Sequence, residues 1–406
     1  MATVSAGKKS SRETRDHKYV KLRRLLDEYI EQGNVGDPLP SFSRMLSDLN
    51  VSQWVADRAL QDLVAAGKIV RINGKGVFIS ERAKQKTVAL VFGDHVDRVM
   101  SGPYPRILMN ACREHALENN QRLVTFFGVP QSEAEADEDP NFHDLAKALR
   151  GKEIDGIFFG GFKKSSGQLT WLTSHGAPVV SSDALPSSRG SSAYVSFDVD
   201  WRELVRMGVD ALARQSCRDI AFIGNYHHGD LRAKGANPDI AYFQEAMQEH
   251  GVVCNPEWIW DPREYISMGG RSMVSEAEAE GFQAMSELWR TLNAQGRRLD
   301  GVVVTDDFLT RGCLSAAFKL GLRLNEDFKI ATHANKGSDA LHRFEDDLSI
   351  MEVDASEMAD AMIQTLTLMM RGKPYEAEQV FKPRLKLPFE SPSRHEYRNA
   401  GQRTPA

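Results

Sequence analysis

The stretch of residues 39–79 constrains the fold of this chain most. Its apolar residues follow the spacing of a short helix with its turn and then of a second helix: Leu46, Leu49, Val51, Val55, Ala59, Leu60 and Leu63. Ser52 can cap the second helix and Gly67 can end it. Residues 69–72 and 77–79 then flank Asn73-Gly74, a strong hairpin signal. The pattern predicts a winged helix-turn-helix, whose second helix is of the kind that enters a DNA major groove.

The same stretch resembles the DNA-binding domain of the GntR family of bacterial transcription regulators. The residues that carry the resemblance are Leu39-Pro40-Ser41, Val51-Ser52, Arg58-Ala59-Leu60, Leu63, Gly67, Ile69, Gly74-Lys75-Gly76 and Phe78. This sequence departs from the family at Phe42-Ser43, which replaces Glu-Arg, and at Gln53, which replaces Arg. The resemblance implies that the partner is double-stranded operator DNA.

The expected DNA-binding residues lie on the two helices and on the hairpin: Ser41, Arg44, Ser52, Gln53, Trp54, Arg58, Gly74, Lys75 and Gly76. Lys75 is expected to reach a phosphate or the adjacent minor groove. Gln53 could read adenine. Asp57 would repel phosphate unless it pairs with Arg58 or accepts a hydrogen bond from a cytosine amino group.

Charge is distributed unevenly along the 406 residues. Residues 1–86 contain 16 Lys and Arg against 10 Asp and Glu, whereas the rest of the chain contains 35 against 46. A basic head on an acidic body suits a head that binds nucleic acid and a body that does not.

Several other classes of protein are disfavoured. No apolar run approaches the roughly 18 residues of a membrane span, and the N-terminus lacks a signal core, so we expect a cytoplasmic protein with no membrane partner. The four cysteines are far apart, which argues against zinc and disulfides. His227-His228 has no further ligand at metal spacing. We therefore predict neither a metal nor a cofactor.

The chain is expected to divide into a disordered tail (1–16), the winged helix-turn-helix (17–80), a charged linker (81–86), an effector domain (87–390) and a second disordered tail (391–406). A stripe of Leu and Ile near residues 22–30 predicts a helix beneath the helix-turn-helix. From residue 87 short apolar runs alternate with amphipathic helices in two series, and Ser275 with Glu278 predicts a helix start. This predicts two doubly wound α/β lobes, with a ligand at the carboxyl ends of their strands.

The predicted strands and helices of the body have specific positions. The strands are expected at 88–92, 122–127, 156–159, 178–181, 220–223, 259–260, 301–304, 329–331 and 349–353. The helices are expected at 105–119, 142–149, 169–175, 204–214, 240–250, 276–293, 309–320 and 356–370. The acidic run 133–139 is expected to be a solvated loop.

This body resembles the effector-binding region of the LacI/GalR family, which is itself similar to periplasmic sugar-binding proteins. The residues that carry the resemblance are 88–92, Pro103-Tyr104, Asp155-Gly156-Ile157, Pro178-Val179-Val180, Asp183, 218–223, Phe243, Gly251, Asp307, Gly321-Leu322 and Glu326-Asp327. The combination of head and body is similar to the arabinose-repressor group of sugar-operon regulators.

The resemblance implies the ligand-binding residues Asp94, Tyr104, Asp183, Asp200, Asn237 and Asp307. Carboxylates accept hydrogen bonds from the hydroxyls of a sugar, and an aromatic ring covers the C–H surface of the sugar. Asp198 is the alternative to Asp200. Asn237 stands where the family has Arg, and Arg232 or Lys234 could supply that cation. Thr332-His333-Ala334 stands where the family has Gly-Phe-Asp.

The sequence predicts a homodimeric regulator of a sugar-catabolism operon, most simply a repressor, controlled by a sugar or sugar derivative. A regulator of a non-sugar molecule, a sugar-binding protein and an α/β enzyme are the alternatives. No GxSxG, GxxxxGK[ST], GxGxxG after a strand or HExxH occurs, so we expect no enzyme. A glycosidase-like carboxylate pair stays open, because its separation is a property of the folded chain.

Overall fold

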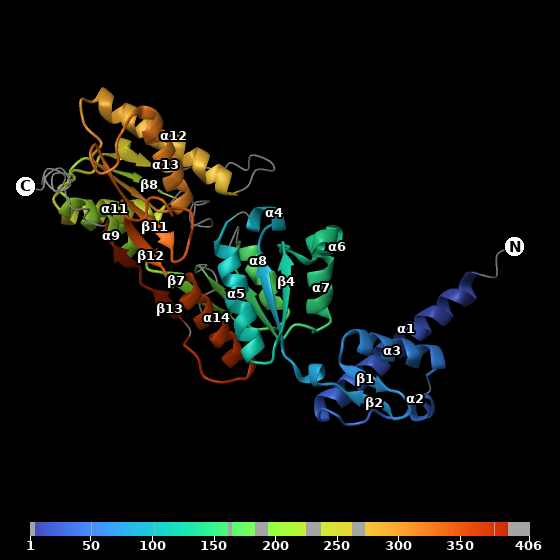
Figure 1. Cartoon of the computed structure of the whole chain (residues 1–406). Helices are drawn as coiled ribbons and strands as arrows, with labels where there is room; N and C mark the ends of the chain where they lie inside the picture. Colours follow the sequence, from blue (N-terminus) through green and yellow to red (C-terminus); the bar gives the residue numbers. More distant parts are fainter. Residues whose placement is uncertain are drawn as a thin grey trace, which may run out of the picture. The chain divides into compact units, whose positions relative to one another are not determined.

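The computed structural model describes residues 5–49, 51–100, 102–160, 165–182, 194–224, 237–261, 273–376 and 378–388. It separates into two compact units (Figure 1). The head comprises Met1–Lys86 with Asn120–Arg122, and the body comprises Thr87–Asn119 with Leu123–Ala406.

The head is built from three helices and a two-stranded hairpin. Its elements are α1 (Ser5–Gln32), α2 (Phe42–Leu49), α3 (Gln53–Ala65), β1 (Ile69–Ile72), β2 (Gly76–Ile79) and the 3-10 helix η1 (Glu81–Lys84). The strands are antiparallel, and Gly74 (φ +73°) and Gly76 (φ +119°) take the positive φ that the tight connection requires. Apolar residues of α1, α3 and both strands, including Leu22, Leu60 and Ile79, form one core. The predicted pair of helices and the hairpin that follows them are confirmed.

The start of α1 corrects the expected disordered tail (1–16) from residue 5 onward, and residues 1–4 lie outside the described residues. The helix begins at Ser5. Between Ser5 and Gln32 the chain has no Pro and its one Gly is Gly7, while Lys, Arg, Glu and Ala, which favour helix, are frequent. The helix that carries the buried Leu22 and Leu26 therefore continues toward the N-terminus without a residue that stops it.

The expected linker over residues 81–86 is also corrected, because η1 packs on the head. The Ser80 hydroxyl accepts a hydrogen bond from the Ala83 amide (3.2 Å) and donates one to the Gly67 carbonyl. Lys84 Nζ donates to the carbonyls of Ile30 (2.8 Å) and Glu31 (2.9 Å), and the Ala83 methyl contacts the core. The sequence pattern missed this, because a charged segment can still satisfy carbonyls at a helix end.

The first lobe of the body is a sheet of order β13-β7-β6-β5-β3-β4. Its strands are β3 (Thr87–Phe92), β4 (Arg122–Phe127), β5 (Gly156–Phe159), β6 (Val179–Ser182), β7 (Tyr194–Val199) and β13 (Glu378–Phe381). Its helices are α4 (Val96–Val99), α5 (Tyr104–Glu118), α6 (Glu133–Glu138), η2 (Pro140–Phe142), α7 (His143–Arg150) and α8 (Ser166–Ser174). Strands β3, β5 and β6 are buried along their whole length, as expected for parallel strands covered on both faces.

The second lobe is a sheet of order β14-β12-β11-β10-β8-β9, parallel except for β14. Its strands are β8 (Ile220–Ile223), β9 (Ile259–Trp260), β10 (Gly301–Val304), β11 (Lys329–Asn335), β12 (Ser349–Val353) and β14 (Arg384–Lys386). Its helices are α9 (Trp201–Arg214), α11 (Pro238–Glu249), η4 (Pro256–Trp258), α12 (Met273–Ala294) and α13 (Asp307–Leu320). Helix α9 packs on β11 and β12.

The chain passes between the lobes more than once. It leaves the first lobe after β7, returns after β12 through α14 (Ala355–Met370), which packs on α5, β5 and β6, and crosses again between β13 and β14. One cluster of buried side chains accordingly includes residues of both lobes, such as Phe158 and Phe222. The α/β class and the two doubly wound lobes are confirmed.

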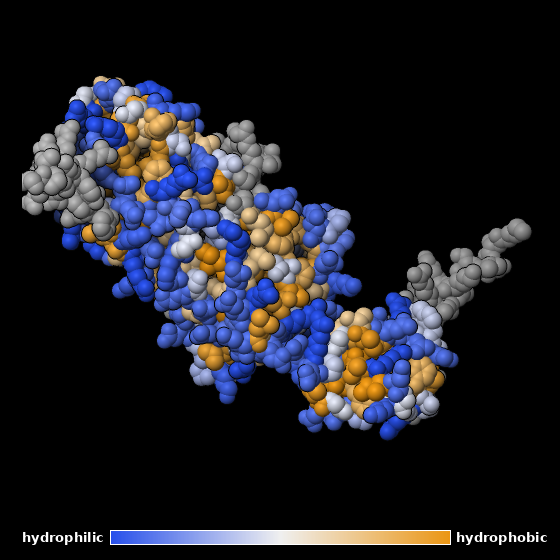
Figure 2. Space-filling view, in the orientation of Figure 1, coloured by the Kyte–Doolittle hydropathy of each residue, from blue (hydrophilic) through white to orange (hydrophobic). Residues whose placement is uncertain are grey.

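Most of the expected strands and helices occur within a few residues of their predicted bounds. Ser275 is not a helix start, since α12 begins at Met273. Edge strands β13 and β14 were not expected, because short strands of mixed polar and apolar residues lack a buried periodic pattern. The predicted tail 391–406 lies outside the described residues. The visible face of both units is mostly hydrophilic with apolar patches (Figure 2).

Candidate nucleic-acid interface and effector site

The start of α3 presents the expected DNA-reading side chains on the surface of the head. The Ser52 hydroxyl caps the helix by accepting from the Val55 amide at 3.4 Å. Gln53, Trp54 and Arg58 are exposed, whereas Val55 and Ala56 between them are buried. The burial of one helix face thus turns the other toward solvent, with a capped and positively polarised N-terminus.

The rest of the expected DNA-binding set lies at the start of α2 and on the wing. The Ser41 hydroxyl accepts from the Arg44 amide at 3.3 Å, so Ser41 caps α2. Gly74, Lys75 and Gly76 form the exposed tip of the hairpin. The Lys75 amide donates to Ile72 O at 3.0 Å, which leaves its side chain to extend from a closed turn.

Asp57 faces a different partner from the one considered from the sequence. Its Oδ1 lies 3.9 Å from Nη2 of Arg71 on β1, and both side chains are more than two-fifths exposed. This ion pair is therefore a weak one. It nevertheless brings a cation beside the carboxylate near the start of α3 that would repel phosphate.

In the body, Asp307 begins α13 at the carboxyl end of β10 and is 5 % exposed. Its Oδ2 accepts a hydrogen bond from the Ser338 hydroxyl at 2.6 Å. Burial raises the pKa of Asp307, while the Ser338 hydroxyl and the neighbouring His333 oppose that rise. A buried carboxylate held by one hydroxyl is suited to accept further hydrogen bonds from a polar ligand.

His333 lies on β11 beside this carboxylate. Its Nδ1 is 3.1 Å from Met351 O, and its ring meets the Trp201 ring edge-on at a centroid distance of 5.6 Å. Burial lowers the pKa of His333, and the Asp307 charge opposes that shift. Trp201, His333 and Ser338 were not among the expected site residues, because α9, β11 and the segment after β11 are brought to Asp307 only by the fold.

Asp94 and Tyr104 follow the first strand of the body, as expected. Asp94 is 7 % exposed and its Oδ1 accepts from the His95 amide at 2.8 Å. Tyr104 is the first residue of α5. A Cβ atom on Gly102 would lie 3.8 Å from the Phe308 ring, so the start of α5 adjoins the start of α13. Tyr104 and Asp307 therefore belong to the same region.

Asp200 and Asn237 cap helices. Asp200 Oδ1 accepts from the Glu203 amide (2.9 Å) and caps α9. Asn237 Oδ1 accepts from the Asp239 amide (3.1 Å), while its Nδ2 donates to Asp261 (2.8 Å). Asp183, Arg232 and Lys234 lie outside the described residues. Asp198, the alternative to Asp200, accepts from the Val199 amide at 2.8 Å.

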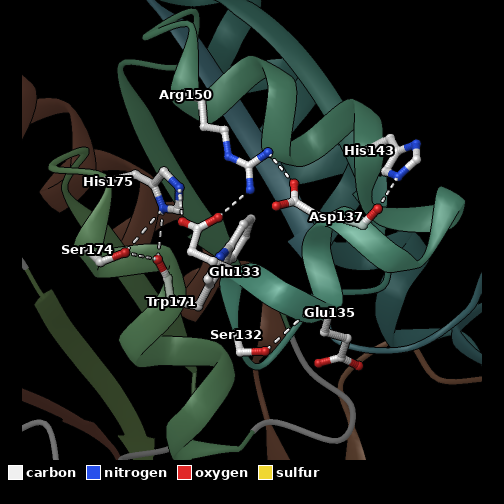
Figure 3. A network of polar contacts seen from close by, with 9 residues as sticks. All are labelled: Ser132, Glu133, Glu135, Asp137, His143, Arg150, Trp171, Ser174 and His175. Atoms are coloured by element: carbon white, nitrogen blue, oxygen red, sulfur yellow. Dashed lines mark hydrogen bonds and ion pairs between the residues drawn. The ribbon is translucent and has the colours of Figure 1, made fainter.

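The acidic run 133–139 is corrected from a solvated loop to a helix with a polar network (Figure 3). Arg150 of α7 pairs with Asp137 (2.7 Å) and with Glu133, whose other oxygen lies 3.2 Å from His175 Nε2. The Arg150 guanidinium keeps the pKa of Glu133 below its ordinary value. The network joins α6, α7 and the end of α8, so its role is to hold these helices together.

Within the described ranges, no group of three or more His, Cys, Asp and Glu side chains could hold a metal ion. His227-His228 is outside those ranges. None of the helices in the described part of the chain is long and apolar enough to span a membrane.

The two-lobed α/β body has the fold of a periplasmic-binding-protein-like domain, and the comparisons agree with this. A family model for a periplasmic binding protein-like domain matches residues 209–387. The structure is similar to that of the transcriptional regulator CelR in complex with cellobiose (TM-score 0.59, 18 % identity, 86 % of this chain and 94 % of that chain). It is also similar to a regulatory protein of the LacI family from Chloroflexus aggregans (TM-score 0.56, 16 % identity, 75 % and 98 %).

A curated relative is similar over a shorter stretch. It is the probable fructoselysine utilization operon transcriptional repressor of Escherichia coli (strain K12), 34 % identical over 73 residues. The match covers 18 % of this chain and 30 % of that protein. The chain thus spans about a third of the length of the curated relatives it matches. The two-lobed periplasmic-binding-protein-like fold expected from the sequence is confirmed.

Proposed function

We propose that this protein is a homodimeric transcription regulator whose GntR-type head binds operator DNA under the control of a small molecule bound by the body. The observation that carries the proposal is the capped, solvent-facing start of α3, with Gln53, Trp54 and Arg58 exposed beside a wing that presents Lys75. This is the arrangement by which such heads place a helix in the major groove and a wing on the backbone.

The effector of this regulator is a sugar or a sugar derivative. Asp307 and Asp94 supply buried acceptors at strand ends, Tyr104 begins α5, and the Trp201 ring meets His333 of the same lobe. The similar regulator structure contains cellobiose, and the curated relative is named for fructoselysine utilization. A non-sugar effector is the alternative, because His333 stands where the resembled family has an apolar aromatic residue.

A thermal-shift screen against monosaccharides, disaccharides and amino sugars tests this assignment. A ligand at one hundred times its dissociation constant stabilises the folded state by about 2.7 kcal/mol. An unchanged melting temperature with every sugar would favour a non-sugar effector. If NMR shows that the protein converts a stabilising sugar chemically, that result would favour an enzymatic function, which we do not expect.

Replacing Lys75 by Ala should weaken binding about equally on all duplex sequences and lower the salt dependence of log K by about one unit, because one phosphate contact is lost. Replacing Gln53 by Ala should instead change which sequence is preferred. Fluorescence anisotropy at several salt concentrations measures both effects.

Lys147→Ala is the matched control for the loss of one positive charge, since Lys147 is exposed on α7 of the body. It should leave the salt dependence unchanged. Identical affinity and salt slope in Lys75→Ala and the wild type would contradict the role given to the wing.

Effector and DNA affinities should depend on one another. Bound effector should change the affinity for DNA, and bound DNA should change the affinity for effector, by the same factor, typically about 5- to 150-fold. A Gly/Ser insert between Lys86 and Thr87 should remove this dependence and leave both binding sites intact, because η1 belongs to the head and the insert then follows it. Titrations of effector with and without DNA measure the factor, and equal affinities in the wild type would exclude the switch.

A further inference from the structure

The Arg58 guanidinium of α3 lies near two aromatic rings. Its carbon is 4.9 Å from the centre of the Tyr19 ring and 5.3 Å from the centre of the Trp54 ring. Trp54 precedes Arg58 by one helical turn on α3, whereas Tyr19 comes from α1. Trp54 is 55 % exposed, so this group of three side chains, here the Arg58 clamp, forms part of the surface of the head.

Tyr19 is anchored at both ends of its side chain. The ring packs against the apolar core of the head, and the hydroxyl donates a hydrogen bond to Asp62 Oδ2 at 2.5 Å. Burial and the Asp62 carboxylate raise the pKa of Tyr19, so the hydroxyl keeps the proton that it donates. The ring is therefore a fixed platform rather than a mobile surface group.

Asp62 stands four residues after Arg58 on the same helix, a spacing at which Arg and Asp side chains attract one another. An ion pair there would draw the guanidinium along the helix. The Tyr19 hydroxyl engages the Asp62 carboxylate instead, while the Tyr19 ring faces the guanidinium. One residue of α1 thus acts on both members of that potential pair.

We propose that Tyr19 is a positioning residue for base recognition, which with Trp54 holds the Arg58 guanidinium so that its N–H edge is presented to guanine in the major groove. The inference rests on the proposed function of the head. Aromatic faces contact the flat sides of a guanidinium and leave its N–H edge available. Two parallel N–H groups match the O6 and N7 acceptors of guanine. Fixing the side chain before binding reduces the entropy lost when those bonds form.

The test uses the full chain and a duplex library with a randomised 24-base-pair centre. The wild type selects a preferred duplex, and its affinity is compared with that for a scrambled duplex of equal composition. Tyr19→Leu keeps an apolar side chain in the core but removes the ring. It should lower the ratio of the two affinities about fivefold, with the scrambled duplex bound as before, because an aromatic contact with a cation contributes on this scale.

Two further variants separate the ring from other effects. Tyr19→Phe keeps the ring and should retain the ratio within about twofold. Tyr29→Leu is the matched control, since Tyr29 lies on the same helix, is 41 % exposed and donates to Pro38 O. It should behave as the wild type. The inference would be overturned if the affinity ratio fell equally in Tyr19→Phe and Tyr19→Leu, or if it were unchanged in Tyr19→Leu.

A measurement without DNA tests the same geometry. The Nε–Hε signal of Arg58, identified by its absence in Arg58→Lys, should show ring-current shifts in the wild type and in Tyr19→Phe, and these should decrease in Tyr19→Leu. Unchanged shifts in Tyr19→Leu would overturn the clamp even if affinities fell. If the wild type selects no sequence and binds duplex DNA without salt dependence, both the proposed function and the Arg58 clamp are wrong. If the wild type does select a sequence but the ratio of its affinities for the preferred and scrambled duplexes does not depend on Tyr19, only the Arg58 clamp is wrong.

Discussion

Replacing Asp307 by Asn should lower the affinity for the effector about ten- to a hundredfold while leaving the body at least as stable as the wild type. Loss of a charge-assisted hydrogen bond costs about 1.5–3 kcal/mol, which corresponds to that factor. Calorimetry with the sugar that stabilises the wild type most measures the affinity, and thermal melting measures the stability.

The expected effect on stability follows from the environment of Asp307. Asp307 is 5 % exposed, and burial raises the pKa of its carboxyl group. A carboxyl whose pKa is higher in the folded than in the unfolded state destabilises the fold at neutral pH, where it must ionise. Asn carries no such charge and can still accept a hydrogen bond from Ser338. Stability and binding should therefore change in opposite directions.

Two neighbouring carboxylates provide matched controls. Asp306 caps α13 by accepting from the amides of Phe308 and Leu309, both at 2.9 Å, and Asp200 caps α9. Asn is as good a cap as Asp. Asp306→Asn and Asp200→Asn should leave effector affinity unchanged. An effect of Asp200→Asn as large as that of Asp307→Asn would move the effector to the α9 end of the lobe.

Replacing Gly312 by Ala should lower the free energy of unfolding of the body by about 3 kcal/mol, at the upper end of the range for overpacking. A Cβ at Gly312 would lie 2.7 Å from the backbone nitrogen of Phe282 and closer still to the carbonyl oxygen of Glu278 on α12. The obstacle is helix backbone, which cannot rotate away as a side chain can. Gly281 on α12 meets the backbone of Leu309 in the same way, so two glycines let α12 and α13 cross closely.

Urea denaturation measures this effect, and its sign is diagnostic. In an open helix, Ala in place of Gly stabilises by about 1 kcal/mol. Ser315→Ala, one turn further along α13 at an exposed position, is the control and should change stability by less than about 0.5 kcal/mol. A stabilised Gly312→Ala variant would show that the helices are further apart than the structure describes.

Local patterns predicted most elements correctly, for reasons visible in particular segments. The runs at β8 and β10 are wholly apolar and buried, and their spacing from the next amphipathic helix is that of a βα unit. The hairpin followed from Asn73-Gly74, because few residues other than glycine tolerate the positive φ found at Gly74. Segments such as β14 gave no such signal, because three residues at a sheet edge bury little.

The sequence by itself determined most of the segments that become helices and strands, and that a head of helices and a hairpin precedes a two-lobed body, because periodicity, caps and turns are local properties. Apart from a predicted cap such as Ser52, the tertiary structure decided what the polar residues do. Asp200 and Asp307 both stand near the start of a helix, yet one caps it and the other meets Ser338 and His333. Tyr19 and Arg58 are 39 positions apart and meet because α1 packs on α3. Contacts of this kind depend on how faces of distant elements pack, which no local pattern encodes.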